Sequence, residues 1–97
     1  MTPAQEHERR ARLAYVNALW DLYQATQREM MAYRVLTATV DQLGPASSET
    51  LKARDAWGAV RYVRELAANT LEQRAQEHAD ALQALAQQEA APPEGSP

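Results

Sequence analysis

The sequence contains no cysteine and no phenylalanine, and it has only three glycines in 97 residues. Without cysteine the chain can form neither disulfide bonds nor a cysteine-based zinc site, and nothing indicates an oxidising compartment. The aromatic residues are two tryptophans and four tyrosines, and much of the apolar content is alanine, which buries little area per residue. We therefore expect a single small domain with a thin core.

Long apolar runs are missing as well. The N-terminal residues are polar and lack the apolar run of a signal peptide. No stretch approaches the ~20 apolar residues that a membrane-spanning helix requires. We expect a soluble protein of the cytoplasm. The formal net charge of −3 and the pI near 5.3 argue against a general nucleic-acid-binding protein.

A first long helix is predicted from residue 3 to residue 43. Thr2 suits the N-cap, Pro3 the first helical position, and Gln5 the closing position of a capping box. No glycine or proline follows until Gly44. Within this helix, one set of largely apolar residues alternates spacings of three and four, as in a face that packs on a neighbouring helix. Tyr15, Leu22, Leu36 and Leu43 widen this stripe on one side, so it suits a helix that touches two neighbours. We expect its central residues to include the contact with the second helix: Val16, Leu19, Tyr23, Thr26, Met30, Tyr33, Thr37 and Val40.

A tight turn over residues 44–47 is predicted to end the first helix. Gly44 can adopt a left-handed conformation there, and Pro45 disfavours continuation of the helix. Ser47 or Ser48 can cap a second helix. So short a connection forces the two helices to run antiparallel.

The second helix is predicted over residues 48–91, and residues 92–97 are expected to be a disordered tail because they have nothing apolar to bury. The predicted fold class is thus all-α, a long antiparallel helical hairpin over residues 1–91. One alternative stays open: a break in the first helix near Gln27 and Arg28 would give a shorter, folded-back bundle. The buried face of the second helix has an average spacing near 3.6, which indicates a nearly straight helix: Ala56, Val60, Val63, Ala67, Leu71, Ala75, His78, Leu82 and Leu85.

A hairpin of this shape is a poor monomer. Each helix would be about 60 Å long, and two such rods bury only one stripe each. We expect homodimerisation into a four-helix bundle, because a two-fold interface needs only one self-complementary patch. Docking onto the helices of a different protein would serve as well. The residues expected at the oligomer seam are Tyr15, Leu22, Leu36, Leu43, Leu71 and Leu82.

Trp57 marks a candidate partner-binding face. Arg54, Arg61 and Arg64 lie three, four and seven positions from it, and therefore on the same or an adjoining helix face. Trp and Arg are typical anchors of protein interfaces, and an indole beside guanidinium groups also suits nucleic-acid binding. The alternative is local: Trp57 lies at the edge of the core, with its ring covered by arginine side chains.

No residue cluster predicts catalysis, a cofactor or a metal. His7 and His78 lie among acidic residues, but neither follows a glutamate at the Glu-x-x-His spacing of metal-binding bundles. Glu29 is expected in a surface ion-pair network with the nearby arginines. Gly58, unusual inside a helix, is expected to let the Tyr33 ring or another backbone approach closely.

These features predict a non-enzymatic protein: a helical adaptor, small chaperone or structural subunit that acts through protein–protein interaction. The alternative is a nucleic-acid-associated accessory factor that uses the Arg/Trp face near the turn.

Overall fold

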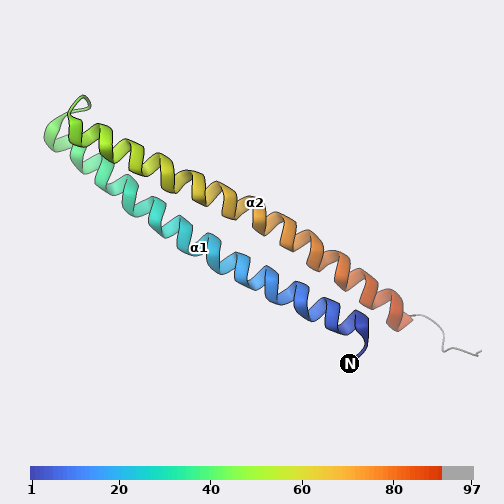
Figure 1. Cartoon of the computed structure of the whole chain (residues 1–97). Coiled ribbons are helices and arrows are strands. Elements are labelled where there is room, and N and C mark those ends of the chain that lie inside the picture. Colours follow the sequence, from blue (N-terminus) through green and yellow to red (C-terminus); the bar gives the residue numbers. More distant parts are fainter. Residues whose placement is uncertain (91–97) are drawn as a thin grey trace, which may run out of the picture.

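The computed structural model describes residues 1–90, which form two long helices side by side (Figure 1). Helix α1 spans Pro3–Leu43 and helix α2 spans Ser48–Ala90. The helices run antiparallel, so that the N-terminus lies beside the far end of α2 (Figure 1). The prediction of an all-α helical hairpin is confirmed. Residue 91 and the tail predicted at residues 92–97 lie outside the described residues.

Helix α1 begins with a reciprocal pair of hydrogen bonds. The Thr2 hydroxyl oxygen accepts from the Gln5 backbone N–H at 3.1 Å, and the Gln5 side-chain oxygen accepts from the Thr2 backbone N–H at 2.9 Å. This capping box satisfies amide groups that have no partner within the helix. Helix α1 then continues unbroken through Gln27 and Arg28, which contradicts the alternative of a folded-back first helix.

The turn is held by hydrogen bonds from both of its sides. The Gly44 N–H donates to the Val40 carbonyl at 2.9 Å, which closes α1. On the other side, the Ser47 hydroxyl oxygen accepts from the Thr50 N–H at 3.1 Å and so caps α2. The buried Thr50 hydroxyl donates to the Gly44 carbonyl at 2.7 Å, and this bond ties the start of α2 to the end of α1.

The two helices meet along a seam whose positions repeat every seven residues. In each helix, one row consists mostly of alanine and a second row carries larger side chains. Ala81 is fully buried, and Ala18 and Ala25 are almost so. Small side chains at a contact shorten the distance between two helix axes. The rows are Ala4, Ala11, Ala18, Ala25 and Ala32 with Glu8, Tyr15, Leu22, Glu29 and Leu36 in α1, and Ala53, Val60, Ala67, Arg74 and Ala81 with Thr50, Trp57, Arg64, Leu71, His78 and Leu85 in α2.

Most of the stripe expected at the contact with α2 faces solvent instead, and only Thr26 and Val40 of its eight residues are half-buried. Val16, Tyr23 and Tyr33 are each about half exposed. The prediction was wrong because it followed the larger side chains, whereas the alanine row brings the helices together. In α2, Ala56, Val63 and Leu82 are also exposed. The seam there keeps an average spacing of 3.5 rather than 3.6, so a face traced at 3.6 drifts away from the contact.

The core is as thin as the composition indicates. The buried apolar residues among those described are four alanines, at positions 11, 18, 25 and 81, and no large side chain is fully buried. The Cα trace measures 79 Å along its longest axis and 16 and 14 Å along the other two. Within residues 1–90, neither helix is long and apolar enough to cross a membrane.

Candidate protein-interaction surface

The described hairpin leaves most of the solvent-facing stripe of α1 exposed, and its large exposed side chains are Val16, Leu19, Tyr23, Met30 and Tyr33. We call it the outer stripe; it consists of the eight residues from Val16 to Val40 named above. Near its N-terminal end, Val16, Leu19, Trp20 and Tyr23 line an open groove of about 360 Å³. The rings of Trp20 and Tyr23 stack there, with centroids 5.5 Å apart and planes 18° apart. Four apolar side chains thus present one shallow, preformed surface.

Charge is absent from the outward half of α1 over about six turns. Between Leu13 and Tyr33 the only charged residues are Asp21, Arg28 and Glu29. Glu29 lies in the seam, and Asp21 and Arg28 share one heptad position on the opposite flank of the seam from the outer stripe. Depletion of charge together with enrichment of aromatic residues and methionine is typical of interface cores. The exposed apolar residues here are Leu13, Val16, Leu19, Trp20, Tyr23, Met30, Met31 and Tyr33.

The outer stripe and the Trp57 face lie on the same side of the hairpin. The Tyr33 and Trp57 ring centroids are 5.8 Å apart, with a tilt of 53° between the planes. Tyr33, Trp57, Glu29 and Met30 line a second surface groove of about 330 Å³. The Arg61 guanidinium lies over the Trp57 ring, 5.3 Å from its centroid. The outer stripe and the Trp57 face therefore form one continuous face of the hairpin.

The four residues predicted to bind a partner have different surroundings in the structure. Trp57 is half-buried between Tyr33 and Arg61, as the local alternative requires. Arg61 also forms an ion pair with Glu65 at 3.2 Å. Arg64 lies in the seam, where it forms an ion pair with Glu29 across the two helices. Arg54 is exposed and has no ion pair among residues 1–90. A role for these residues in binding a partner stays a prediction.

Some of the residues predicted for an oligomer seam are half-buried within the hairpin, and others are exposed. Tyr15, Leu22, Leu36 and Leu71 lie half-buried in the seam between α1 and α2. Leu43 and Leu82 are exposed. The packing of α1 against α2 thus already uses four of the six side chains, and the outer stripe takes their place as the apolar surface left for a partner. The signal that sequence reasoning missed is alanine at every seventh position from Ala4 to Ala32.

A polar cluster interrupts the seam near the open end of the hairpin. His78 Nε2 and a Glu8 carboxylate oxygen lie 2.9 Å apart, and both side chains are mostly buried. The Tyr15 ring stacks on His78 with centroids 5.7 Å apart. Arg12 adds a longer contact to Glu8, at 3.7 Å. Glu8 and His78 are each other's partner across the seam, so the cluster has a structural role in joining the helices.

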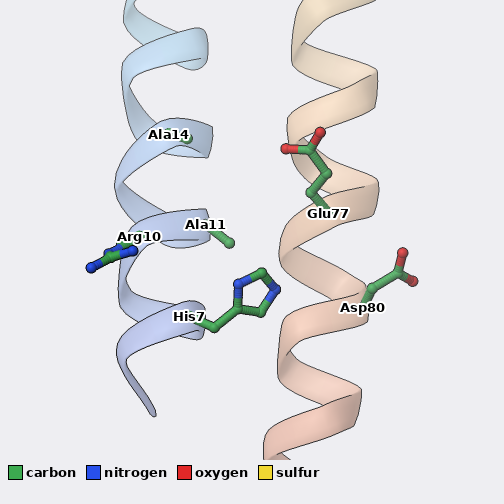
Figure 2. A pocket seen from close by; sticks show the side chains of 6 residues that line it. All are labelled: His7, Arg10, Ala11, Ala14, Glu77 and Asp80. Carbon is green, nitrogen blue, oxygen red and sulfur yellow. The ribbon is translucent and has the colours of Figure 1, made fainter. Parts of the chain in front are cut away.

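His7 lies beside this cluster but not in it. Figure 2 shows its ring pointing toward α2, while the Asp80 carboxylate points away from α1. Together with Arg10, Ala11, Ala14 and Glu77 these residues line an open pocket of about 340 Å³. Glu77 is already paired with Arg74 at 2.9 Å. Among residues 1–90, no group of three or more His, Asp or Glu side chains is placed to hold a metal ion.

Glu6 and Arg9 form an ion pair in the first turns of α1. The hydrogen bond from the Arg9 guanidinium holds the pKa of the Glu6 carboxyl below its usual value. The same hydrogen bond raises the pKa of Arg9. Arg9 is exposed and Glu6 is partly exposed, so this pair is a surface ion pair.

The expectation that the Tyr33 ring packs on Gly58 is wrong. A Cβ atom built on Gly58 would have no neighbour within 4 Å, so no side chain packs against this glycine within the described hairpin. Tyr33 contacts the preceding residue, Trp57, instead. A glycine that weakens a helix by about 1 kcal/mol relative to alanine has no packing role in the hairpin itself.

Comparison with known proteins gave no matching family model, no matching curated protein and no matching solved structure.

Proposed function

We propose that this protein is a non-enzymatic interaction or assembly protein, an adaptor, small chaperone or structural subunit that acts by completing a helical bundle. The observation that supports this is the uncharged outward half of α1, with eight large apolar side chains exposed between Leu13 and Tyr33. Contiguous exposed apolar patches of this extent mark interaction sites. The partner is either a second copy of the chain or the helices of another protein.

The geometry of α1 supports a bundle rather than an isolated hairpin. At 100° per residue, the outer stripe is centred about a quarter turn around the helix from the seam. A helix in a square four-helix bundle contacts its two neighbours at this angle. One face of α1 is occupied by α2, so the outer stripe is the place for another helix.

Photo-crosslinking in living cells tests this proposal. A benzoylphenylalanine replaces Trp20 on the outer stripe's edge, or Val35 on the opposite flank as the matched control; both side chains are 58% exposed. We expect a defined covalent adduct from position 20 and none from position 35. A third variant at Met30 should give the adduct with the same protein. Equal adducts from all three positions, or none from any, would contradict the proposal.

The nucleic-acid alternative has less support. Of the three arginines around Trp57, Arg61 and Arg64 are paired with carboxylates, and the indole ring is covered by Tyr33 and Arg61. Phosphate contacts would have to replace these ion pairs. Salt-sensitive binding of a labelled oligonucleotide to the purified protein would revive this alternative.

We propose the cytoplasm as the compartment. Support comes from the sequence alone, because the chain has no cysteine with which to form stabilising disulfides.

A further inference from the structure

Building on the proposed function, we infer that the occupant of the outer stripe is a second copy of this chain. The second hairpin lies face to face with the first and points in the opposite direction, so that α1 packs on α1 and α2 on α2. Three observations support this arrangement: the amount of exposed surface, the two-fold match of the side chains, and the charge distribution.

The exposed surface exceeds that of a monomer by the amount that a dimer would bury. A folded monomer of this mass exposes about 5,500 Å². This chain exposes 7233 Å², an excess of roughly 1,700 Å² over that value. Standard interfaces bury about 800 Å² per partner, and obligate dimers bury more. The excess is large enough for one such interface per copy.

The outer stripe is self-complementary when two copies of α1 run antiparallel. With the two-fold axis near Gln24, Val16 of one copy lies opposite Tyr33 of the other, and Leu19 lies opposite Met30. Next to the axis Tyr23 lies opposite Thr26, so the central layers pair large side chains that are mostly apolar. At the ends of the stripe, Thr37 and Val40 lie opposite Arg12 and Arg9. The symmetry makes every such contact occur twice.

The same axis also matches the two copies of α2. The Tyr33–Trp57 contact and the Thr2–Gln88 hydrogen bond place the residues around Gln24 across from those near Leu66. We place the point where the axis crosses α2 between Leu66 and Ala67. Arg61 and Glu72 lie equally far from this point, one on each side. Arg61 of one copy therefore lies opposite Glu72 of the other.

Two further pairs are related by this axis. Leu51 lies opposite Leu82, and both are exposed in the hairpin. Gly58 lies opposite Ala75, where two small residues permit close approach of the helices. This gives Gly58 the packing role that it lacks in the single hairpin.

The charge distribution favours opposite directions. From Leu66 to the C-terminus only Arg74 opposes Glu72, Glu77, Asp80, Glu89 and Glu94, whereas residues 28–65 carry one excess positive charge. Hairpins that point the same way would bring their acidic ends together. Hairpins that point in opposite directions place each acidic end beside the partner's turn end, where Arg34, Lys52 and Arg54 have no ion pair among residues 1–90.

The experiment measures mass and orientation on the full-length protein. Sedimentation equilibrium is expected to give twice the chain mass of 10.8 kDa. Because the chain has no cysteine, Ala46→Cys in the turn supplies a single spin-label site. In the antiparallel dimer the two Ala46 positions are separated by about 65 Å. In a dimer whose turns lie together they would be within about 20 Å.

A pair of matched variants tests the surface. Val16→Glu places one charge per copy in the interface and should weaken the dimer by about a hundredfold or more. Val35→Glu, on the opposite flank and of similar exposure, should leave the dimer unchanged. The label distance is measured on a chain with an intact outer stripe, so it does not depend on whether Val16→Glu folds.

Each result decides between the possibilities. A dimer with the long label distance, weakened only by Val16→Glu, supports the inference. A monomer, a short label distance, or equal effects of the two glutamate variants overturns it. A monomer whose Trp20 crosslinks to a different protein in cells overturns the second copy as occupant and leaves the proposed function standing.

Discussion

Single alanines set the spacing between the two helices. Ala18 is 5% exposed and belongs to the alanine row of the seam. Ala18→Leu forces a larger side chain into this contact and should lower the free energy of unfolding by about 1–3 kcal/mol. Urea denaturation measures the change. Ala38→Leu, on the exposed surface of α1, is the control and should change stability little; equal losses in both variants would contradict the alanine seam.

The ion pair between Glu29 and Arg64 gives a second prediction. The side chains are 18% and 31% exposed, so the pair is partly desolvated. Arg64→Leu leaves the Glu29 carboxylate without its partner and should lower the free energy of unfolding by about 1–2 kcal/mol, allowing for solvent screening. The double variant Glu29→Leu with Arg64→Leu fills the same seam positions with apolar side chains. Denaturation should show it to be at least as stable as the unmodified protein, and a loss equal to the sum of the single effects would refute the argument.

At the scale of the helices, local sequence signals place the ends. Thr2 with Gln5 forms the predicted capping box, and Ser47 caps α2 as one of two predicted candidates. α1 ends at Leu43, directly before Gly44. The helix ends could be predicted from the sequence because each cap depends only on residues within one helical turn of it.

The face of α1 that contacts α2 could not be predicted from local sequence signals. The stripe beginning at Val16 and the row beginning at Tyr15 have the same heptad spacing and are offset by one residue. Periodicity alone does not say which of two stripes meets the nearer neighbour. Larger side chains favoured the wrong stripe, whereas the alanine row decides how closely two helices pack. Because the alanine row faces α2, Glu29 lies in the seam and forms an ion pair with Arg64, while Arg61 forms an ion pair with Glu65.

The turn depends on one backbone conformation. Gly44 has φ 85° and ψ 166°, a region that residues with a side chain rarely adopt. Gly44→Ala should therefore lower the free energy of unfolding by about 1–3 kcal/mol, although no atom lies within 4 Å of the added Cβ. Thermal unfolding followed by circular dichroism gives the comparison. Ala46→Gly in the same turn, where φ is not positive, is the control for a simple change in turn flexibility.

For the whole molecule, stability and assembly are coupled if the bundle is a dimer. The hairpin buries only alanines among its apolar side chains, so the outer stripe supplies much of the apolar surface that folding can bury. Mass action then makes the melting temperature depend on protein concentration. We expect it to rise by a few degrees for each tenfold increase in concentration, and to show no such rise in Val16→Glu. Calorimetry over a hundredfold concentration range measures both. A melting temperature independent of concentration in the unmodified chain would mean that the hairpin is stable by itself and that the outer stripe contributes nothing to folding.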